Sequence, residues 1–475
     1  MIIDPLSTLP RIASGRGIHV WDSDGKRYID ASGGPAAFSI GHGNREVNDA
    51  IKKQLDDIAF GYRFHFRSDA AEELTEIITR RAGGDLGHVI FTTGGSEAVE
   101  SCLKLALQYH QARGETSRVR FISRERSWHG NTLGALSVSG FHQRQRPYRG
   151  SLIETSRLSP VNAYRPPAGV AAGDVAEHCA AELENEIARL GAENVAAFIF
   201  EPVVGAAGGA VPAPDGYARR IREICDRTGV LMIADEVMCG VGRCGTWRAL
   251  EHDGVEPDIM SIAKGLSGGY LPLGAAVFSR QVAEPIYAVD GLPITGHTFT
   301  AHTTCCAAAV AVQRIIERDD LVARVAANGE LLRARLEESL GQHPHVGDIR
   351  GRGFFQGVEI VEDRETAEPF SPDARMFQRI MRTGFDNGLI VYPTGGNVDG
   401  IRGDQIIIAP PYNATTDELD TIVDLLRGTI DEAIASFAPR TVAPASPARS
   451  KTSSGSATPD ATVLRGRVVG GSAHD

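Results

Sequence analysis

Cysteine is scarce in this sequence and forms no metal or disulfide pattern. The chain of 475 residues has 7 cysteines, an odd number, with no CxxC pair and with Cys305 next to Cys306. Disulfide frameworks and structural zinc sites depend on paired or closely spaced cysteines. We therefore expect no disulfide scaffold and no metal site, and we expect a reducing compartment, the cytoplasm.

Long apolar runs and an excess of positive charge are also missing. No apolar stretch approaches the length that spans a bilayer, and residues 1–11 lack a basic segment followed by an apolar run. Nucleic acids and anionic membranes are bound through clustered Lys and Arg, but this chain carries a net charge of -11. We expect no secretion signal, no nucleic acid partner and no membrane partner.

The composition is that of a globular α/β protein. Hydrophobic residues make up 42% of the chain and charged residues 23%, and there are 53 glycines, which excludes fibrous and disordered classes. A single hydrophobic core stops growing beyond about 250–300 residues. The length therefore predicts two packed lobes with extensions.

The apolar runs predict how the chain is organised. Short strands at 19–24 and 26–30 surround an Asp24-Gly25 turn, which predicts an N-terminal β-hairpin. From about residue 60, helical segments alternate with short apolar runs, which predicts a mainly parallel sheet. The predicted strands are residues 88–92, 119–123, 196–200, 230–234, 259–262 and 274–278, and a helix with an apolar stripe is expected at 96–113.

The second half of the chain has a different pattern. Long helices at 305–318 and 321–340 lead to residues 346–360 and a final helix at 417–437, which indicates a smaller α+β lobe. After Pro439 the sequence mixes Pro, Ser, Thr, Ala and Gly without periodicity, which predicts disorder. The predicted domains are an N-terminal segment at 1–60 that contributes to the small domain, a large domain at 61–300, a small domain at 301–437 and a disordered tail at 438–475.

Two reactive side chains follow buried strands. Asp235 ends the run VLMIAD, and Lys264 follows the run IMSIA, with glycines around it. Ligands gather at the carboxyl edge of parallel strands. A desolvated lysine forms Schiff bases with aldehydes, and a carboxylate can hold a pyridine nitrogen protonated. Either residue alone would more often be a solvated lysine or a helix cap, but together they indicate an electron sink.

The sequence from about residue 15 to 435 resembles the class III pyridoxal-phosphate aminotransferases, also called the ω-aminotransferase or ornithine aminotransferase-like group. The similar motifs are VLMIADEVMCGVGRCGTW, PDIMSIAKGLSGGY, TTGGSEAVE, SWHGNTLGAL, GHTFTAH and EPVVGAAGG. The resemblance implies the α/β fold type I of aspartate aminotransferase, with a large, mainly parallel domain and a smaller α+β domain. It also implies pyridoxal 5'-phosphate as cofactor, with Lys264 as its Schiff-base lysine and proton shuttle, Asp235 on the pyridinium nitrogen and Val237 on one ring face.

Other motifs supply further candidate residues. In TTGGSEAVE, the backbone N–H groups of Gly95 and Ser96 at a helix start can receive a phosphate. The resemblance implies that Trp128 stacks on the other face of the cofactor. It implies that Thr298 reaches the phosphate of the neighbouring subunit, so that a homodimer shares its active sites. It also implies that Glu201 faces the substrate and pairs with a mobile arginine.

The sequence departs from the family pattern at two places. Many relatives that use α-ketoglutarate have an arginine shortly before the Pro-Pro of the C-terminal lobe, but IIIAPPY at 406–412 is apolar. Arg402 in the preceding loop GGNVDGIRGD is a candidate replacement, because glycines permit motion, although a loop arginine is usually only solvated. The position after Val237 is commonly Gln and contacts the phenolic oxygen of the cofactor, whereas this chain has Met238.

Three alternatives remain beside transamination. The loop at 240–245 spells GxGxxG, as in NAD-dependent dehydrogenases, but it neither follows its strand directly nor opens a clear helix. A regulator that only senses pyridoxal phosphate would need a DNA-binding or partner module, which the acidic composition does not supply. A decarboxylase, epimerase or aminomutase of the same fold would use the same lysine and aspartate.

The sequence thus predicts an enzyme that transfers amino groups. We expect a pyridoxal-phosphate-dependent transaminase that moves an amino group from an amine or amino acid donor to a keto acid or aldehyde acceptor. The predicted route uses a lysine Schiff base and a pyridoxamine phosphate intermediate. The expected partners are a small amine donor, a keto acid acceptor and a second copy of the chain.

Overall fold

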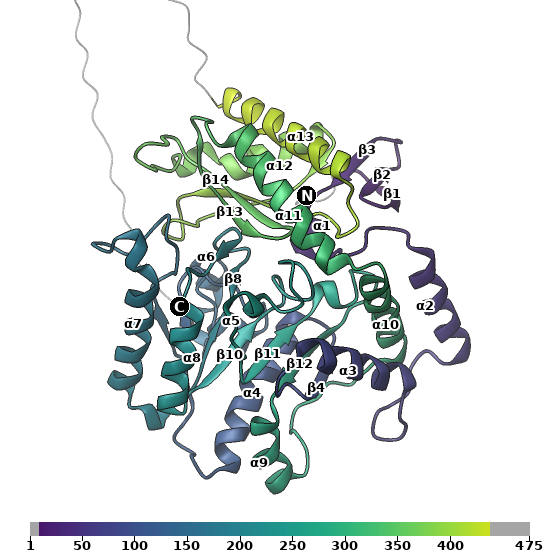
Figure 1. Ribbon diagram of the computed structural model, residues 1–475, viewed down its shortest axis with the longest axis vertical. Coiled ribbons are helices and arrows are strands. Elements are labelled where there is room, and N and C mark those ends of the chain that lie inside the picture. The colour runs from purple at the N-terminus through teal and green to yellow at the C-terminus, as the bar shows by residue number, and fades with distance from the viewer. Residues whose placement is uncertain (1–8, 438–475) are drawn as a thin grey trace, which may run out of the picture. The chain divides into compact units, whose positions relative to one another are not determined.

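The computed structural model describes residues 9–437, and Figure 1 shows their path. The predicted tail at 438–475 lies outside the described residues. In the part of the chain that is described, no helix combines the length and the apolarity needed to cross a bilayer.

The residues predicted to be reactive, Asp235 and Lys264, lie at or just after the ends of strands in a seven-stranded sheet. In spatial order its strands are β4 (His88–Thr92), β12 (Gly274–Phe278), β11 (Ile259–Ile262), β10 (Leu231–Asp235), β7 (Val195–Phe200), β5 (Arg120–Arg124) and β6 (Thr155–Leu158). β10 pairs in parallel with β7 and β11, and β5 with β6 and β7, whereas β12 runs antiparallel to both of its neighbours. The expected mainly parallel sheet is confirmed, with β12 as the exception.

The predicted strands of this sheet agree with the observed ones to within one residue at each end. The reason is that each is a short apolar run, and β7, β10, β11 and β12 are buried along their whole length. β6 was not predicted. Its sequence TSRL has a single buried residue, so it lacks the apolar signal of an inner strand.

Helices cover both faces of the sheet: α7 (Val175–Leu190) and α8 (Tyr217–Thr228) lie on one face, and α4 (Gly95–Ala112) and α9 (Arg280–Asp290) on the other (Figure 1). Successive residues of a strand point to opposite faces. Phe198 and Phe200 of β7 therefore pack with α7 and α8, while Ala197 and Ile199 pack with α4 and α9. The predicted helix at 96–113 is confirmed as α4.

A second sheet follows later in the chain. Its strands, in spatial order, are β13 (Val346–Arg352), β14 (Phe355–Ile360), β17 (Asp404–Ile408) and β16 (Tyr392–Gly395), all paired antiparallel. The helices around it are α10 (Thr303–Arg318), α11 (Leu321–Leu340), α12 (Met376–Asp386) and α13 (Thr416–Ala435). The long helices and the final helix agree with the prediction, whereas α12, β16 and β17 were not predicted.

The N-terminal hairpin is also observed. A small sheet has the order β1 (Ile12–Arg16), β2 (His19–Asp22), β3 (Arg27–Asp30) and β15 (Leu389–Ile390). β2 and β3 are antiparallel around the predicted turn, and β15 pairs in parallel with β3. The N-terminal residues thus pair with residues near 390. The domain limits at 60, 300 and 437 stay predictions.

The remaining elements are short or connect the sheets. The helices are α1 (Gly33–Ala36), α2 (Arg45–Asp57), α3 (Asp69–Ala82), α5 (Leu133–Ser137) and α6 (His142–Gln145). The two-residue strands are β8 (Val203–Val204) and β9 (Val211–Pro212). The 3-10 helices are η2 (Arg146–Ser151), η3 (Ala172–Asp174), η4 (Ala192–Asn194), η5 (Ala249–Asp253), η6 (Lys264–Leu266) and η7 (Pro372–Ala374).

One buried arginine joins three distant segments of the chain. Arg243 lies in the turns after β10 and is only 1% exposed. Its guanidinium donates hydrogen bonds to the carbonyl oxygens of Phe38 (2.7 Å), Phe354 (3.2 Å) and Pro410 (2.5 Å). The guanidinium carbon also lies 4.7 Å from the centre of the Tyr412 ring. This side chain therefore ties the loop beside the large sheet to the segment after α1, to the β13–β14 turn and to the segment after β17.

We predict that Arg243→Met lowers the free energy of unfolding by about 3 kcal/mol, because three buried carbonyl groups lose their donor. Urea unfolding followed by circular dichroism measures this change. Arg333→Met is the matched control, since Arg333 forms a partly exposed pair with Glu337 on α11 and should change stability by less than about 0.5 kcal/mol. Equal losses in both variants would contradict the bridging role of Arg243.

Candidate active site

A cavity of about 390 Å³ lies at the carboxyl edge of the seven-stranded sheet. Asp235 is the last residue of β10, Glu201 directly follows β7, and Lys264 comes two residues after the end of β11. Parallel strands bring their carboxyl ends to one edge, so these side chains meet. The predicted site residues that line the cavity are Gly95, Ser96, Trp128, Glu201, Asp235, Val237 and Lys264.

Lys264 begins η6 with an unusual backbone conformation. Its φ is +44°, a left-handed value that costs about 1–3 kcal/mol in a residue with a β-carbon. The turn is held from behind by Gln313 of α10, whose Nε2 donates hydrogen bonds to the carbonyl oxygens of Gly265 (3.3 Å) and Leu266 (2.9 Å). A helix after residue 300 therefore stabilises the strained turn that carries the lysine.

The surroundings of Lys264 favour its neutral form. Burial lowers the pKa of the Lys264 amine from its ordinary value to about 8, against the opposite effect of the carboxylates of Asp235 and Glu201. A neutral amine is both a nucleophile and a base. Because the pKa lies near neutrality, an appreciable fraction of Lys264 is reactive under ordinary conditions.

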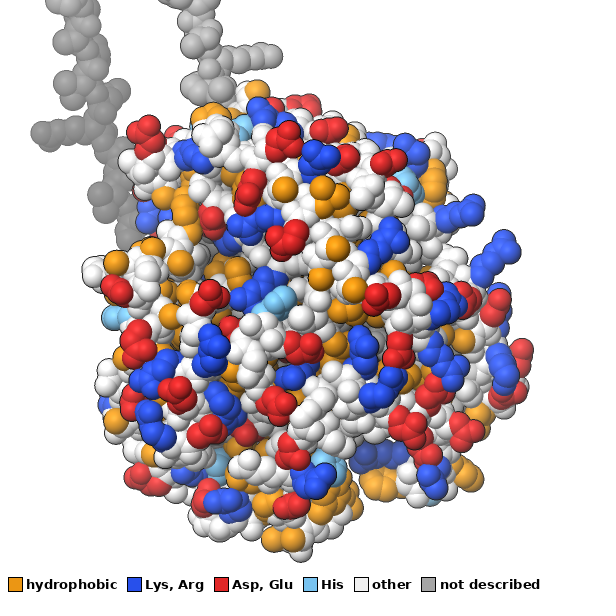
Figure 2. Space-filling model, viewed as in Figure 1, with side chains coloured by type: hydrophobic (Ala, Val, Ile, Leu, Met, Phe, Trp, Pro, Cys, Tyr) orange, Lys and Arg blue, Asp and Glu red, His pale blue; other side chains and the backbone are white. Residues whose placement is uncertain are grey.

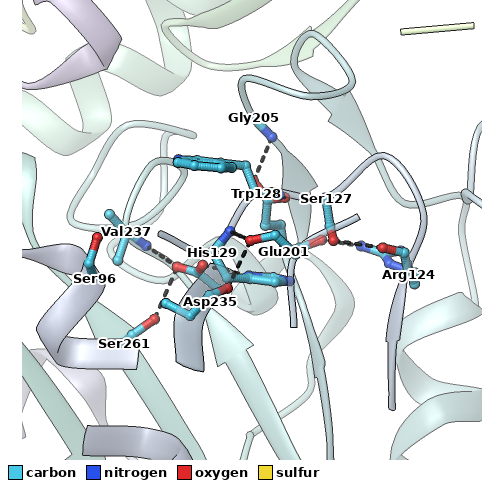
Figure 3. A network of polar contacts seen from close by, with 12 residues as sticks. Ser96, Arg124, Ser127, Trp128, His129, Glu201, Gly205, Asp235, Val237 and Ser261 are labelled. Carbon is cyan, nitrogen blue, oxygen red and sulfur yellow. Dashed lines mark hydrogen bonds and ion pairs between the residues drawn. The ribbon is translucent and has the colours of Figure 1, made fainter. Parts of the chain in front are cut away.

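Asp235 is a buried carboxylate with three hydrogen-bond partners. Its Oδ1 accepts from the Ser261 hydroxyl (3.0 Å) and from the backbone N–H of Val237 (3.0 Å), and its Oδ2 lies 2.7 Å from Nδ1 of His129 (Figure 3). Only 3% of the residue is exposed. An ionised carboxylate can only accept, so the His129 contact places a proton on Nδ1. The side chain is therefore held in one orientation.

His129 and Ser261 were not predicted as site residues. His129 lies in the SWHGN motif next to Trp128, so its place in the motif was a signal that the analysis of the sequence did not use. Ser261 is an inner residue of β11 whose sequence shows no functional pattern. Both are fully or almost fully buried; His129 lines the cavity itself, and Ser261 acts on it through Asp235.

Glu201 is fixed by the backbone rather than by an arginine. Its Oε1 accepts a hydrogen bond from the backbone N–H of Trp128 (2.9 Å), and its Oε2 accepts one from Gly205 (2.7 Å), as Figure 3 shows. The Glu201 carbonyl oxygen accepts from the buried Arg124 guanidinium (2.6 Å). Burial raises the pKa of the Glu201 carboxyl, and His129 opposes that rise. Glu201 thus places a carboxyl group in the cavity wall and holds the chain at Trp128.

The start of α4 supplies donors for an anion. The helix begins at Gly95, and Gly94 before it makes no side-chain cap, so the first backbone N–H groups have no partner within the helix. A helix start with free N–H groups and a positive dipole end attracts phosphate. A β-carbon at position 95 would lie 2.7 Å from Cγ1 of Val237, so glycine keeps this approach open. Ser96 Oγ accepts from the backbone N–H of Asn131 at 2.9 Å.

Trp128, Val237 and Met238 form part of the cavity lining. The Trp128 ring meets Phe141 edge to face, with 5.9 Å between ring centres and an angle of 87°. Met238 stands where the family commonly has Gln, and its sulfur would lie 2.5 Å from a β-carbon on Gly205. This side of the cavity is therefore apolar and closely packed.

Thr298 and Arg402 do not line the cavity. Thr298 is exposed. The Arg402 guanidinium is bound to the carboxylates of Asp399 (2.6 Å) and Glu368 (3.1 Å). Arg402 would have to leave both carboxylates to bind a substrate, and its predicted role stays a prediction.

The glycine-rich segment at 240–245 does not resemble a dinucleotide site in its structure. It consists of turns, and the first element after it is η5, a 3-10 helix of five residues. A dinucleotide loop leads directly from a strand into an α-helix. The segment also carries Arg243, whose guanidinium is used for the contacts between sheets described above.

The residues around the cavity fit the parts of pyridoxal 5'-phosphate. The phosphate needs N–H donors, which the start of α4 provides. The pyridine nitrogen needs an anionic partner, and Asp235 is held in place for this contact. The aldehyde needs a neutral amine, and Lys264 has its pKa lowered to about 8. All three face one cavity. In residues 9–437, no group of three or more His, Cys, Asp or Glu side chains is arranged to hold a metal ion.

Comparison with known proteins indicates one family. The model of the family described as Aminotransferase class-III matches residues 6–430. An aminotransferase of Schizosaccharomyces pombe is 41% identical over 430 residues, which cover 90% of this chain and 94% of the relative. An adenosylmethionine-8-amino-7-oxononanoate aminotransferase of Nitratidesulfovibrio vulgaris is 34% identical, covering 88% of this chain and 76% of the relative.

Solved structures give the same result for the fold. An (S)-enantioselective ω-transaminase from Thermomicrobium roseum has a TM-score of 0.84 and 32% identity, covering 92% of this chain and 96% of that chain. An amine transaminase from an uncultivated Pseudomonas species, in its PLP-bound form, has a TM-score of 0.83 and 35% identity, covering 92% and 97%. The predicted fold type I architecture is therefore confirmed.

We predict that the apo-protein captures pyridoxal 5'-phosphate faster as the pH rises through about 8, because only the neutral Lys264 amine attacks the aldehyde. Stopped-flow measurement of the visible absorbance gives the rate constant at each pH. Below the pKa, the rate constant should rise about tenfold for each pH unit. A midpoint near 10.5, the ordinary value for lysine, would show that the cavity does not shift this amine.

Proposed function

Since this chain belongs to the class III aminotransferases, we propose that Lys264 and Asp235 are the residues that carry its transfer of amino groups. The protein is an enzyme of that family, a pyridoxal-phosphate-dependent aminotransferase. The relatives described above are aminotransferases, and none is a decarboxylase, epimerase, aminomutase or dehydrogenase. The observation that carries the proposal is the single cavity in which Lys264, with its lowered pKa, meets the buried carboxylate of Asp235.

Pyridoxal phosphate, when bound, supplies the electron sink that stabilises negative charge on the donor carbon. In the proposed site, Gly95 and Ser96 bind the phosphate through their backbone N–H groups. Asp235 would face the ring nitrogen, since the hydrogen bonds from Ser261 and Val237 hold its carboxyl group in one orientation. Val237 and Trp128, which line the cavity, would hold the two faces of the ring.

Lys264 is the proposed base for the proton transfers. Its Nζ takes a proton from the donor carbon and delivers a proton to the cofactor side of the same cavity. A pKa near 8 suits this task, because an amine with its ordinary value would be almost fully protonated and could not accept. Trp128 and Val237 contribute by orientation, since they limit the direction from which Lys264 meets the donor carbon.

The proposed donor is an amine or amino acid, and the proposed acceptor is a keto acid or aldehyde. Among the described residues that line the cavity, Lys264 is the only Lys or Arg, while Glu201 and Asp235 are carboxylates. A cavity lined by two carboxyl groups and one amine favours a donor that is uncharged or positively charged at the end away from its amino group. The named activities of the structural neighbours, amine transaminase and ω-transaminase, agree with such donors. Arg402, the candidate from the sequence for binding a substrate carboxylate, would have to leave Asp399 and Glu368 to do so.

The proposed active unit is a homodimer in which each cavity receives the partner's Thr298. Several large apolar side chains near this residue and on the α2–α3 connection are more than half exposed: Ile58, Phe64, Phe66, Ile294 and Phe299. Figure 2 shows hydrophobic side chains at the lower right, where Figure 1 places the α2–α3 connection. Grouped exposed apolar side chains are typical of an interface.

The proposed location is the cytoplasm. All seven cysteines are free thiols, and six of them are buried. Burial raises the pKa of Cys225 and Cys306 to about 12, so these thiols are unreactive. A reducing compartment suits a chain of this kind.

We predict that Lys264→Ala removes the visible absorbance of the holoenzyme and lowers turnover by about 1,000-fold or more, because the amine that binds the aldehyde and moves the proton is gone. Absorbance spectra and amino transfer to pyruvate measure the two effects. Lys104→Ala is the control, since Lys104 is exposed on α4. Turnover in Lys264→Ala equal to that of the control would refute the assignment.

We predict that Glu201→Gln lowers kcat/KM for an amine donor by about tenfold, because one of the two backbone N–H groups that Glu201 binds then faces an amide NH2 group. Loss of the negative charge should also raise the preference for 2-oxoglutarate over pyruvate. Steady-state kinetics with both acceptors measure the ratio. Glu223→Gln, at an exposed position of α8, is the control, and an unchanged acceptor ratio in Glu201→Gln would exclude an electrostatic role.

A further inference from the structure

A keto acid brings a carboxylate to a cavity wall that has no free cation to receive it. The lining residues include the carboxyl groups of Glu201 and Asp235, and Lys264 is used by the chemistry. Repulsion from Glu201 would oppose the carboxylate of the acceptor unless a cation lies close by. If the enzyme transfers amino groups to keto acids, as proposed above, another residue must bind that carboxylate.

Arg144 on α6 lies over the aromatic wall of the cavity. Its guanidinium carbon is 5.7 Å from the centre of the Trp128 ring and 5.8 Å from that of Phe141, and these two rings meet edge to face. Trp128 lines the cavity. Arg144 is itself exposed. A guanidinium on an aromatic face is held by cation–π attraction while its N–H groups remain free to bind a ligand.

Tyr392 of β16 lies on the Met238 side of the cavity. Burial raises the pKa of the Tyr392 phenol, and the positive charge of Arg144 acts against that rise. Tyr392 packs against the cluster that contains Met238 and Ala36. Met238 lines the cavity next to Val237, and Ala37 is another lining residue. Arg144 is therefore placed beside the cavity wall by its contact with Trp128.

Arg144 differs from the neighbouring arginines in its pairing. Within the described residues, no carboxylate lies within 4.0 Å of its guanidinium, whereas Arg402 is bound to Asp399 and Glu368, and Arg126 has Glu125 at 3.6 Å. An arginine that is already neutralised must give up those contacts before it binds a substrate. Arg144 would give up only weak cation–π contacts with the rings of Trp128 and Phe141.

We propose that Arg144 binds the carboxylate of the keto acid acceptor, and of an amino acid donor, at the mouth of the cavity. The planar guanidinium can donate two parallel hydrogen bonds to a carboxylate, which a lysine ammonium cannot match. With an amine that has no carboxylate, the guanidinium stays on the Trp128 and Phe141 rings, and no unpaired charge enters the cavity. One site thereby accepts acids and plain amines in the two halves of the reaction.

The test separates the two half-reactions of the holoenzyme. Arg144→Ala should raise KM for pyruvate by about 10- to 100-fold, because a charge-assisted hydrogen-bond pair is lost. The half-reaction with 1-phenylethylamine, which has no carboxylate, should stay within about twofold of wild type, as followed by loss of the visible absorbance. Arg144→Lys should give an intermediate KM for pyruvate, since it keeps the charge and loses the paired geometry.

Arg146→Ala is the matched control, since Arg146 is a nearby exposed arginine on η2 and should leave both half-reactions unchanged. An unchanged KM for pyruvate in Arg144→Ala would overturn the inference. Equal losses in both half-reactions would also overturn it, because they would mean that Arg144 only supports Trp128. An acid-selective loss in Arg402→Ala, without one in Arg144→Ala, would assign the carboxylate to Arg402. The proposed function itself fails only if wild type transfers no amino group to pyruvate or 2-oxoglutarate.

Discussion

The buried carboxylate of Asp235 is the group on which the geometry of the site depends. A buried charge is costly unless hydrogen bonds satisfy it. The three partners of Asp235 come from three separate segments: His129 from the loop after β5, Ser261 from β11 and Val237 from the turn after β10. Because these three hydrogen bonds hold Asp235, they also fix the segments that carry Trp128, the neighbour of His129, and Val237. Both side chains line the cavity.

Lys264 shows a balance between two opposed electrostatic effects. Burial favours the neutral amine, and the carboxylates of Asp235 and Glu201 favour the charged one. Together, the two effects place the pKa of the amine at about 8, so part of it is neutral and reactive near neutral pH. The strained turn at Lys264 persists because Gln313 of α10 binds the carbonyl groups that follow it, so a helix beyond residue 300 contributes to the chemistry of the large sheet.

The Glu201 carboxyl group in the cavity wall has no arginine partner among the described residues. Backbone N–H groups of Trp128 and Gly205 bind both oxygens of Glu201, so the side chain needs no mobile cation to hold it. Arg402 is occupied by Asp399 and Glu368, and Arg144 rests on Trp128. Selection between acids and plain amines, as proposed above, combines the carboxyl group of Glu201 in the wall with the guanidinium of Arg144 on Trp128.

The sequence by itself determined the proposed reactive pair. Lys264 and Asp235 each follow a short apolar run, and the alternation of such runs with helices predicted that their ends share one sheet edge. The glycines and serine at the start of α4 were local signals of the same kind. Only the tertiary structure decided that β12 is antiparallel, that His129 contacts Asp235, and that Arg402 pairs with Asp399 while Arg144 lies over Trp128. His129 and Asp235 are 106 residues apart in the chain. Contacts of this kind depend on strand order and on the packing of distant segments, and local periodicity carries information about neither.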